Sequence, residues 1–552
     1  MIKEEIKQII QKAIAGFTKE APDFSIEASA DKQHGDYSSN IALVLAKRLG
    51  KNPKEAAESI KNKINSDNFE KIEIAGPGFI NFFIKDKFFI DEIKKINKNF
   101  GKSGELKKQR IILDYTNPNI LKEFHIGHLM NNTIGESLSR IFEFHGAKVK
   151  RVCYQSDVGL GVARAVWGKM KDSSLEWGEA YALGYKAFKE DDKAKQEIIE
   201  LNKKIYEKSD KKINKLYGEG KRASLKHFGE IYKRLGAKFD WLIFESETAA
   251  LGKKIVEKGL KGGIFEKGEN GAIIFKGEKY GLHTRVFINS EGLPTYEAKD
   301  LGLAEIKYKK YKYDKSIIVT GNEVNEYFKV MLAAMDKVLP KLAKKTQHIG
   351  HGMLRLPEGK MSSRTGSVIT AESLMEKIKE LILEKIKDRD LSDAEKGEIS
   401  EKVAIGAIKY SILKQSIGSD IIYDFDKSIS FEGDSGPYLQ YSHTRAQSVL
   451  RKAEKEGVRA SFKKIPGEIT RLEKTMSYFP DMVSQANKNY EPHFLVLYLT
   501  GLASAFNNYY AKNRIVYKPD EFSPYKVALT NSFAAIMKNG LWLLGIETLR
   551  KM

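Results

Sequence analysis

Strand-like and helix-like patterns alternate through the middle of the chain, and few architectures accommodate this order. Three short runs rich in β-branched and aromatic residues are each followed by a segment with helical spacing: Arg110 to Tyr115, Lys148 to Tyr154 and Lys315 to Thr320. A helix that follows a strand carries the chain back to the same end of the sheet, so that neighbouring strands run parallel. The alternation therefore predicts an open parallel α/β sheet with helices packed on it.

A segment of different pattern precedes the α/β region. Residues 1–100 begin with isoleucines at helical spacing and close with a strand-like stretch interrupted by Gly76-Pro77-Gly78, which predicts a small α+β domain. The α/β region itself is expected to occupy residues 106–370. Between about residues 162 and 247 a charged and mostly helical stretch suspends the alternation, and we interpret it as a helical insertion.

Helical periodicity fills the C-terminal third of the chain. Glycine and proline are confined there to breaks such as Gly433 to Pro437 and Tyr517 to Pro524. We therefore expect connecting helices over residues 371–430 and an all-α bundle over residues 431–552, appended to the α/β core.

The charge balance indicates a class of partner. The chain of 552 residues carries 94 Lys and Arg against 73 Asp and Glu, a formal net charge of +21. A surplus of this size favours polyanions, either nucleic acid or a membrane surface, although a lysine-rich proteome would produce the same surplus. The net charge therefore indicates which partners the protein can bind, and it does not constrain the fold.

Compartment and cofactors are constrained by what the sequence lacks. The longest apolar run, Phe494 to Phe506, is too short to span a bilayer, and the first residues have no signal-peptide core. The single cysteine, Cys153, permits neither an internal disulfide nor a thiolate cluster. We expect a cytoplasmic protein without a membrane span, a zinc ion, another protein-bound metal or an organic cofactor.

A histidine pair follows the first strand of the expected sheet. The motif His125-Ile126-Gly127-His128 opens a helix-spaced segment, shortly after Asn117-Pro118-Asn119. The first turn of a helix has unpaired N–H groups that bind phosphate, and a glycine there lets a nucleotide ring approach the backbone. A histidine pair alone is equally typical of an exposed surface or an adventitious metal site. A second copy, His348-Ile349-Gly350-His351, lies in a strand-like run with no helix after it.

A basic loop bracketed by glycines follows the second histidine pair. It contains Lys360-Met361-Ser362-Ser363-Arg364. Lysine, hydroxyl and backbone N–H groups in such a loop can close over a triphosphate and stabilise charge on departing pyrophosphate. Taken alone, the loop is as consistent with solvated surface as with a phosphate site.

In this order the two motifs resemble the HIGH and KMSKS signatures of class I aminoacyl-tRNA synthetases. Within that class the chain is most similar to arginyl-tRNA synthetases, and this resemblance covers nearly the whole chain. It rests on Gly35-Asp36-Tyr37, Gly76 to Phe82, Asn117-Pro118-Asn119, Tyr296-x-x-x-Asp300, Gly433 to Arg445 and Leu544 to Met552. The resemblance implies a Rossmann-type core that makes arginyl-adenylate from arginine and ATP, releasing pyrophosphate. Transfer to the terminal adenosine of tRNA(Arg) would then release AMP.

The resemblance assigns catalytic and ATP-binding roles to matching positions. Lys122, His125, His128 and Lys360 would be catalytic. The ATP-binding residues would be His125, Gly127, His128, Lys360, Met361, Ser362 and Ser363. The fourth KMSKS position, a lysine in the class pattern, is Ser363 here, and Lys122 matches a lysine before HIGH that is thought to compensate in the arginyl family.

The resemblance also assigns the arginine site. A guanidinium is a planar fork of donors that a carboxylate accepts in two places. The matching positions are Asp114, Asn119, Tyr296, Asp300 and Glu323. An acid at any of them could instead cap a helix or face solvent.

Contacts with tRNA are implied at both ends of the chain. Phe79 and Asn81 match positions that contact the D-loop, and Tyr441, Tyr510 and Met552 match positions around the central anticodon base. Aromatic residues at helical spacing are more often part of a core than platforms for bases. The expected partners are tRNA(Arg), arginine and ATP with Mg²⁺, and the protein is expected to be a monomer.

Two other functions fit part of these features. Another class I synthetase or a related nucleotidyltransferase would share both signatures, but a bare nucleotidyltransferase would have no anticodon domain to match Gly433 to Arg445. A catalytically silent tRNA-binding relative would not need the intact His125, His128 and Lys360.

Overall fold

The computed structural model describes residues 2–18, 20–29, 32–355 and 370–552. Its centre is a sheet of five parallel strands. The strands are β5 (Arg110–Asp114), β6 (Lys148–Gln155), β7 (Trp241–Phe244), β11 (Lys315–Gly321) and β12 (Thr346–His351). Their order across the sheet is β12-β11-β5-β6-β7. The prediction of an open parallel α/β sheet is confirmed.

Strand order reverses at the middle of this sheet. From β5 the chain moves outward to β6 and β7, and it then returns to the other side of β5 to form β11 and β12. At such a reversal the loops after the two central strands diverge and leave a crevice at the carboxyl edge. A ligand-binding site is therefore expected at the loops after β5 and β11.

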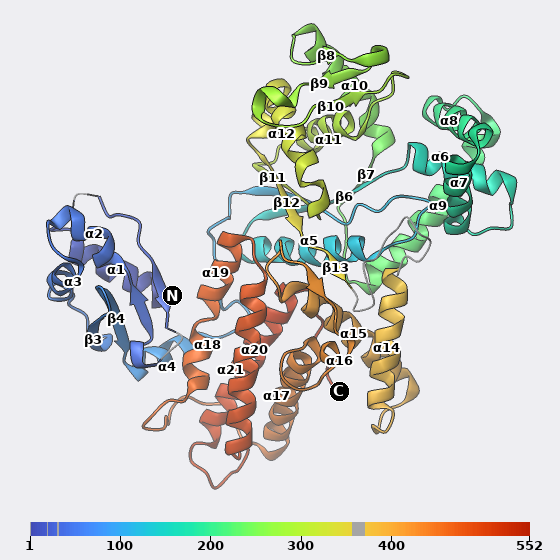
Figure 1. Cartoon of the computed structure of the whole chain (residues 1–552). Coiled ribbons are helices and arrows are strands. Elements are labelled where there is room, and N and C mark those ends of the chain that lie inside the picture. The colour runs from blue at the N-terminus through green and yellow to red at the C-terminus, as the bar shows by residue number, and fades with distance from the viewer. Residues whose placement is uncertain (1, 19, 30–31, 356–369) are drawn as a thin grey trace.

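Helix α5 (Ile126–Phe144) is the centre of the molecule. It lies between the sheet and the C-terminal helices, running across the middle of Figure 1. Fifteen of its nineteen residues are buried. A helix covered all round must satisfy its polar groups internally, and the charged ones lie in its C-terminal half.

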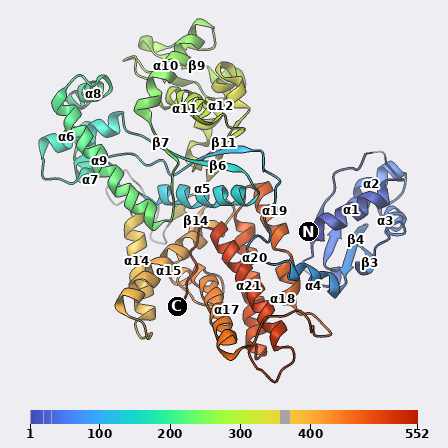
Figure 2. The ribbon, with the colours of Figure 1, turned by 180° about the vertical axis from the view of Figure 1, so that it is seen from behind.

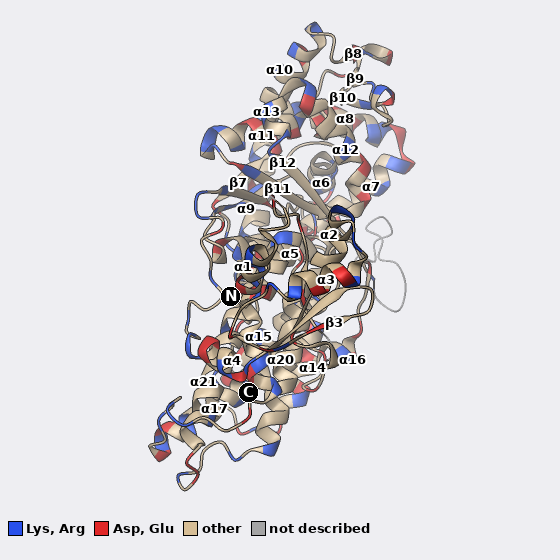
Figure 3. Cartoon of the chain, turned by 90° about the vertical axis from the view of Figure 1, so that its left-hand side faces the viewer, with Lys and Arg blue, Asp and Glu red and all other residues tan. Residues whose placement is uncertain are grey.

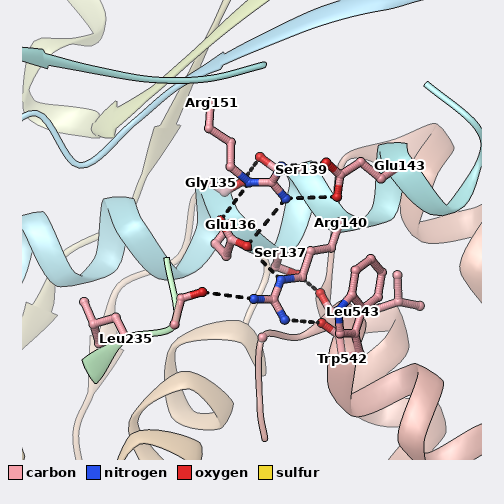
Figure 4. Close-up of polar contacts among 12 residues, drawn as sticks. Gly135, Glu136, Ser137, Ser139, Arg140, Glu143, Arg151, Leu235, Trp542 and Leu543 are labelled. Carbon is pink, nitrogen blue, oxygen red and sulfur yellow. Dashed lines mark hydrogen bonds and ion pairs between the residues drawn. The ribbon is translucent and has the colours of Figure 1, made fainter. Parts of the chain in front are cut away.

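A buried carboxylate, Glu136, joins α5 to its surroundings (Figure 4). It forms ion pairs with Arg151 of β6, at 3.0 Å, and with Arg140 of the next helical turn, at 2.8 Å. Arg140 also donates to the carbonyl oxygens of Trp542, at 2.9 Å, and Gly236, at 3.2 Å. One charge cluster therefore connects the sheet, the insertion and the C-terminal helices.

The insertion consists of four helices at the right of Figure 1. They are α6 (Leu160–Lys171), α7 (Trp177–Glu190), α8 (Asp192–Glu207) and α9 (Lys211–Arg234). Strand β7 follows and pairs with β6 in the central sheet. It lies inside the range of residues 162–247 that the sequence pattern assigned to the insertion, so the alternation resumes earlier than expected.

The second half of the α/β region contains a small antiparallel sheet that the sequence pattern did not predict. Its strands are β8 (Glu266–Lys267), β9 (Ile273–Phe275) and β10 (Arg285–Ile288). The helices of this half are α10 (Glu245–Lys261), α11 (Tyr296–Tyr311), α12 (Asn325–Val338) and α13 (Pro340–Ala343). Together these elements form the upper part of Figure 1.

The N-terminal domain is a four-stranded antiparallel sheet with helices packed on it. The strands are β1 (Ile26–Ala28), β2 (Tyr37–Ser39), β3 (Phe69–Ala75) and β4 (Phe79–Ile84), in the order β1-β2-β4-β3. The helices are α1 (Ile2–Ile14), α2 (Ile41–Leu49), α3 (Pro53–Lys61) and α4 (Asp86–Lys94). In α1 the buried isoleucines recur at intervals of four, as the predicted helix requires.

In its described residues the C-terminal region is helical apart from one short strand pair, β13 (Leu354–Arg355) with β14 (Ile421–Ile422). Its helices are α14 (Ala371–Ile386), α15 (Asp393–Leu413), α16 (Phe425–Ser428), α17 (Gly436–Glu456), α18 (Arg471–Ser477), α19 (Phe479–Asn489), α20 (His493–Lys512) and α21 (Ser523–Leu543). Seen from behind, these helices lie below α5, with the N-terminal domain beside α18 and α19 (Figure 2). The predicted fold class, an α/β core between an α+β domain and a helical bundle, is confirmed.

The N-terminal domain docks on the C-terminal helices through Gly35-Asp36-Tyr37. The Tyr37 hydroxyl donates to Asp481 at 2.7 Å, and Lys474 forms an ion pair with Asp36 at 2.9 Å. Tyr37 also packs edge to face on Tyr478. A motif singled out in the sequence therefore connects two domains.

Lysine and arginine are distributed over every domain and alternate with acidic residues along the ribbon (Figure 3). Within the residues that the structure describes, no helix combines the length and apolar character needed to cross a membrane.

Substitution of Gly135 in α5 by alanine should destabilise the protein. A Cβ atom there would lie 2.2 Å from Cγ of Tyr115, a buried ring held by a hydrogen bond to Glu136 at 2.7 Å. We expect Gly135→Ala to lower the free energy of unfolding by about 1–3 kcal/mol.

The matched control is Gly229→Ala in α9. That site is exposed and has no neighbouring atom within 4 Å, so the alanine should stabilise by up to about 1 kcal/mol. Urea unfolding of both variants measures the difference. Equal stability of the two variants would contradict this account of α5 packing.

Candidate active site

The loop between β5 and α5 has an unusual backbone. Three non-glycine residues adopt positive φ there: Thr116 at 78°, Asn117 at 46° and Leu121 at 62°. The Asn117 side chain holds the loop on the sheet, because it accepts from the Tyr154 N–H at 2.7 Å and donates to Asp114 at 3.0 Å. Such conformations persist only where surrounding contacts determine them, and they cluster at functional sites.

The two histidines of the motif cap the N-terminus of α5. His125 is the N-cap residue, and its Nδ1 accepts from the Gly127 N–H at 3.1 Å. Nδ1 of His128 accepts from the His125 N–H at 3.3 Å, and the two rings stack at 3.6 Å. With both Nδ1 atoms accepting, the proton of each neutral ring lies on Nε2.

Both imidazoles are neutral at physiological pH. Burial, with a smaller contribution from the charge of Lys122, lowers the pKa of His125 to about 4. Burial also lowers the pKa of His128, with smaller contributions from His125 and Lys122. Two neutral Nε2–H donors at a helix N-terminus suit phosphate oxygens.

Lys122 lies between this helix and the insertion. Its Nζ is 4.5 Å from the centre of the Tyr181 ring of α7. Its charge acts on both histidines, which places the ammonium beside the anion-binding end of α5.

The segment with Lys360, Met361, Ser362 and Ser363 lies outside the described residues. The described residues that follow it contact this site. Strand β13 ends at Arg355, and Thr370 pairs with His125 in an isolated antiparallel bridge. The Ala371 N–H donates to the Phe124 carbonyl at 2.8 Å.

The second histidine motif has structural contacts. It lies in β12, and no helix begins at it. His348 stacks on Phe328 at 3.9 Å and bonds Thr320 at 2.7 Å. His351 is buried and bonds Asn131 of α5 at 2.7 Å.

An acidic group lies on α11, within electrostatic reach of Asp114 at the end of β5. Tyr296, at the first position of α11, is 59% exposed. Asp300 lies one turn further on the same face and accepts from the Tyr327 hydroxyl at 2.5 Å. Burial raises the pKa of Asp300 to about 7. Among the described residues, no Lys or Arg forms an ion pair with Asp300.

The other predicted acids have different surroundings. Asp114 is fully buried, with its two oxygens bonded to Asn117 and to Lys307 at 2.9 Å. Glu323 is exposed at the end of β11. Asn119 is half-buried and pairs with Ser156 of the loop after β6.

A further acid, Glu245, was not predicted from the sequence. It begins α10 and forms a buried ion pair with Lys299 at 2.6 Å, and Lys299 lies 5.0 Å from the ring of Tyr296. Glu245 also contributes to the raised pKa of Asp300, which places it in the same acidic group. Its position directly after a strand of the sheet was the available signal.

Two of the three residues assigned to the anticodon lie together. Tyr441 of α17 and Tyr510 of α20 face Arg445, which is 4.7 Å from the first ring and 5.0 Å from the second. Arg445 was not singled out from the sequence, although it ends a quoted motif. Met552 is half-buried against the same bundle.

The C-terminal tail is held by its backbone. Lys409 donates to the Gly545 carbonyl at 2.7 Å, Gln440 to that of Glu547 at 2.8 Å and Thr444 to that of Leu549 at 3.3 Å. Arg140 of α5 also donates to the Trp542 carbonyl, just before the tail. Together these bonds hold the tail along its path from α5 to the bundle.

The two residues assigned to the D-loop differ in exposure. Phe79 begins β4 and is 37% exposed, whereas Asn81 is 3% exposed in the middle of the sheet. The Gly76-Pro77-Gly78 turn therefore presents the ring but not the amide.

Two kinds of group lie at the carboxyl edge of the sheet. The N-terminus of α5 offers neutral imidazole N–H groups and a lysine to an anion. The face of α11 offers a carboxylate that has no ion-pair partner in the described part of the chain, beside an exposed tyrosine. Phosphate and a guanidinium are the ligand groups that match them.

Three family models match the chain in succession. The model of the arginyl-tRNA synthetase N-terminal domain matches residues 1–84, that of the class I (R) tRNA synthetase catalytic domain matches residues 92–425, and that of the DALR anticodon-binding domain matches residues 439–552.

Curated relatives match over their full length. The arginine–tRNA ligase of Fusobacterium nucleatum is 30% identical over 567 residues, covering 99% of both chains. That of Clostridium acetobutylicum is 31% identical over 575 residues, covering 100% of this chain and 99% of the relative.

Solved structures share the fold. The arginyl-tRNA synthetase of Plasmodium falciparum has a TM-score of 0.80 at 22% identity, covering 100% of this chain and 99% of that one. The Thermus thermophilus arginyl-tRNA synthetase has a TM-score of 0.77 at 22% identity, covering both chains fully. With a catalytic-domain match over more than half of its length and full-length relatives at 30% identity or more, the chain belongs to the arginyl-tRNA synthetases, within class I.

Proposed function

We propose that the crevice after β5 and β11 activates arginine with the Mg²⁺ complex of ATP and that the enzyme acts as a cytoplasmic monomer. The overall reaction joins arginine to tRNA(Arg) and releases AMP and pyrophosphate. The observation that carries the assignment to this crevice is that two groups flank the end of β5: the histidine-capped α5, which follows it, and Asp300, which interacts electrostatically with Asp114 and has no cation partner among the described residues.

Adenylate formation is a displacement at phosphorus. The arginine carboxylate attacks the α-phosphorus, and the bond to the bridging oxygen of pyrophosphate breaks. Positioning and charge stabilisation supply most of the catalysis in such a reaction. The Nε2–H groups of His125 and His128 and the ammonium of Lys122 donate to phosphate oxygens, and Gly127 leaves room for the nucleotide. Support for Lys360, Met361, Ser362 and Ser363 comes from the sequence motif alone.

The arginine side chain is bound at α11. Asp300 accepts the guanidinium, and Tyr296 packs beside it. Asp114 and Glu245 are already paired with lysines, so Asp300 is the acid of this group that is left to bind the guanidinium. Asn119 holds the backbone groups of arginine, and Glu323 lies at the rim of the crevice. A buried acid left unpaired by a neutral amino acid disfavours that amino acid without an editing step.

Recognition of tRNA occurs outside the catalytic domain. Tyr441, Tyr510 and Met552 bind the anticodon, supported by the grouping of the two rings around Arg445. Phe79 stacks on the D-loop from the N-terminal domain, supported by its exposure, whereas the buried Asn81 does not reach the tRNA. Basic residues on every domain contact phosphates along the tRNA.

Arginine-dependent exchange of pyrophosphate into ATP tests the activity. We expect exchange with arginine and none above background with the other amino acids. Measurement with and without total tRNA also shows whether activation needs bound tRNA. Exchange with another amino acid, or with none, would contradict the proposal.

The KM for arginine should depend on pH through Asp300. A carboxyl with a raised pKa is protonated below about pH 7, and a protonated acid no longer attracts a guanidinium. The KM should therefore rise about tenfold for each pH unit below 7 and level off above it.

Two variants control this measurement. Asp300→Asn should raise the KM and abolish its pH dependence. Asp336→Asn, at an exposed position of α12 beside Lys337, should leave the profile unchanged. A wild-type KM that is constant between pH 6 and 8 would disprove the assignment.

Lys122→Ala should lower the rate of adenylate formation by about a hundredfold, with little effect on the KM for arginine, because it removes a charge that stabilises phosphate oxygens. The control is Lys189→Ala, which removes a comparable lysine contact with Tyr185, at 4.7 Å, on the surface of α7. Pyrophosphate exchange measures both. Normal exchange by the Lys122 variant would remove Lys122 from the mechanism.

A further inference from the structure

The insertion contacts the strained part of the active-site loop. The Leu121 N–H donates to Oγ of Ser224, on α9, at 2.9 Å. Ser224 is 8% exposed, so this amide has little access to water. Because Leu121 has a φ of 62°, its N–H group is not part of a helix or strand hydrogen-bond pattern. The Ser224 hydroxyl is therefore its hydrogen-bond acceptor.

The side chain of Leu121 is enclosed by the same helices. A Cβ atom on Gly220 of α9 would lie 2.5 Å from Cδ2 of Leu121 and 2.6 Å from the ring of Trp177. Only glycine therefore lets the leucine reach this position. Its backbone and its side chain are both held by α9.

A third contact continues the pattern toward the histidines. The ring of Phe124, the residue before His125, packs on Phe228 at 5.9 Å and on Tyr232 at 6.2 Å. Gly220, Ser224, Phe228 and Tyr232 recur every four residues and thus share one face of α9. That face covers the loop from Leu121 to Phe124.

Lys122 is held from α7. Its Nζ lies 4.5 Å from the Tyr181 ring of α7. Helix α6 lies beside the same side chain, because a Cβ atom on Gly161 would lie 3.3 Å from Cε of Lys122. The residues on both sides of Lys122 in the loop therefore contact the insertion, and so does its own side chain.

The N-terminal part of the same face of α9 holds the neighbouring loop. Tyr217 and Lys221 both donate to Oδ2 of the fully buried Asp157, at 2.9 and 2.7 Å. This loop is joined to the first one, because the Ile120 N–H donates to the Ser156 carbonyl at 3.1 Å. Two loops of the crevice are therefore fixed to one helix.

We propose that the insertion is a clamp, made of one face of α9 with Tyr181 of α7, that positions Lys122 and His125 for adenylate formation. Ser224 is its main positioning residue. The proposal gives the insertion a role in catalysis, and it rests on the proposed function.

The first test is Ser224→Ala. It leaves the Leu121 amide without its partner, so Lys122 loses its fixed position. The kcat of arginine-dependent pyrophosphate exchange should fall about tenfold or more, because small displacements of catalytic groups are costly, while the KM for arginine stays within about twofold. Tyr181→Leu, which leaves α9 intact, should lower kcat in the same way.

Ser523→Ala is the matched control. Its hydroxyl is also buried and also accepts a backbone N–H, that of Tyr517 at 3.0 Å, but it lies in the C-terminal bundle. This variant should keep its kcat at saturating tRNA. An unchanged kcat in Ser224→Ala, or an equal loss in both variants, would overturn the clamp.

A double-mutant cycle separates positioning from general damage. If Ser224 acts by placing Lys122, Ser224→Ala should change kcat by no more than about twofold in a Lys122→Ala background. Full additivity of the two losses would show that Ser224 does not act through Lys122.

Hydrogen–deuterium exchange provides a readout that does not need activity. Peptides spanning residues 116–124 should take up deuterium faster in Ser224→Ala than in the wild type, with unchanged uptake in the C-terminal bundle. Unchanged uptake over residues 116–124 would overturn the clamp. Failure of arginine exchange in the wild type would instead contradict the proposed function.

Discussion

The arrangement of the molecule depends on one buried charge, the carboxylate of Glu136. Burial alone would raise its pKa, but Arg151, Arg140 and the Tyr115 hydroxyl hold it below its ordinary value. A buried carboxylate is tolerable only with such partners. Because they come from the sheet, from α5 and from the loop before it, satisfying this charge fixes α5 on the sheet. The N-terminus of α5, with both histidines, takes its place as a result.

The distribution of lysines divides the acids of the crevice by role. Asp114 and Glu245 each have a lysine partner, at 2.9 and 2.6 Å, so their charges are balanced before substrate binds. Among the described residues, Asp300 has a tyrosine hydroxyl on one oxygen and no ion-pair partner. Its carboxylate therefore keeps a charge that a ligand can pair with, and Tyr327 orients it. Under the proposed function, selectivity for arginine depends more on this one oriented carboxylate than on the number of acids.

The sequence predicted the fold class and the histidine site because both depend on local patterns. Alternation over long segments identified the parallel sheet, and the motif after the first strand identified the N-terminus of α5. Strand β7, at four residues, and β8 to β10, at two to four, are too short to show a period beside charged helices. The pairing of Asp114 with Lys307 joins residues 193 positions apart, and no single-sequence pattern reports such a contact. The burial of Asn81 likewise depends on strands that flank it in space.

The C-terminal tail has a property that follows from how it is attached. Lys409, Gln440 and Thr444 bond to its carbonyl oxygens, and every residue type supplies such an oxygen. The side chains of Leu544, Ile546 and Leu549 are buried as well, so both the backbone and these side chains fix the tail. Its length is therefore constrained, because inserting or deleting one residue would move these groups out of register with their partners. The number of residues that follow α21 therefore sets the position of the C-terminal residue, Met552.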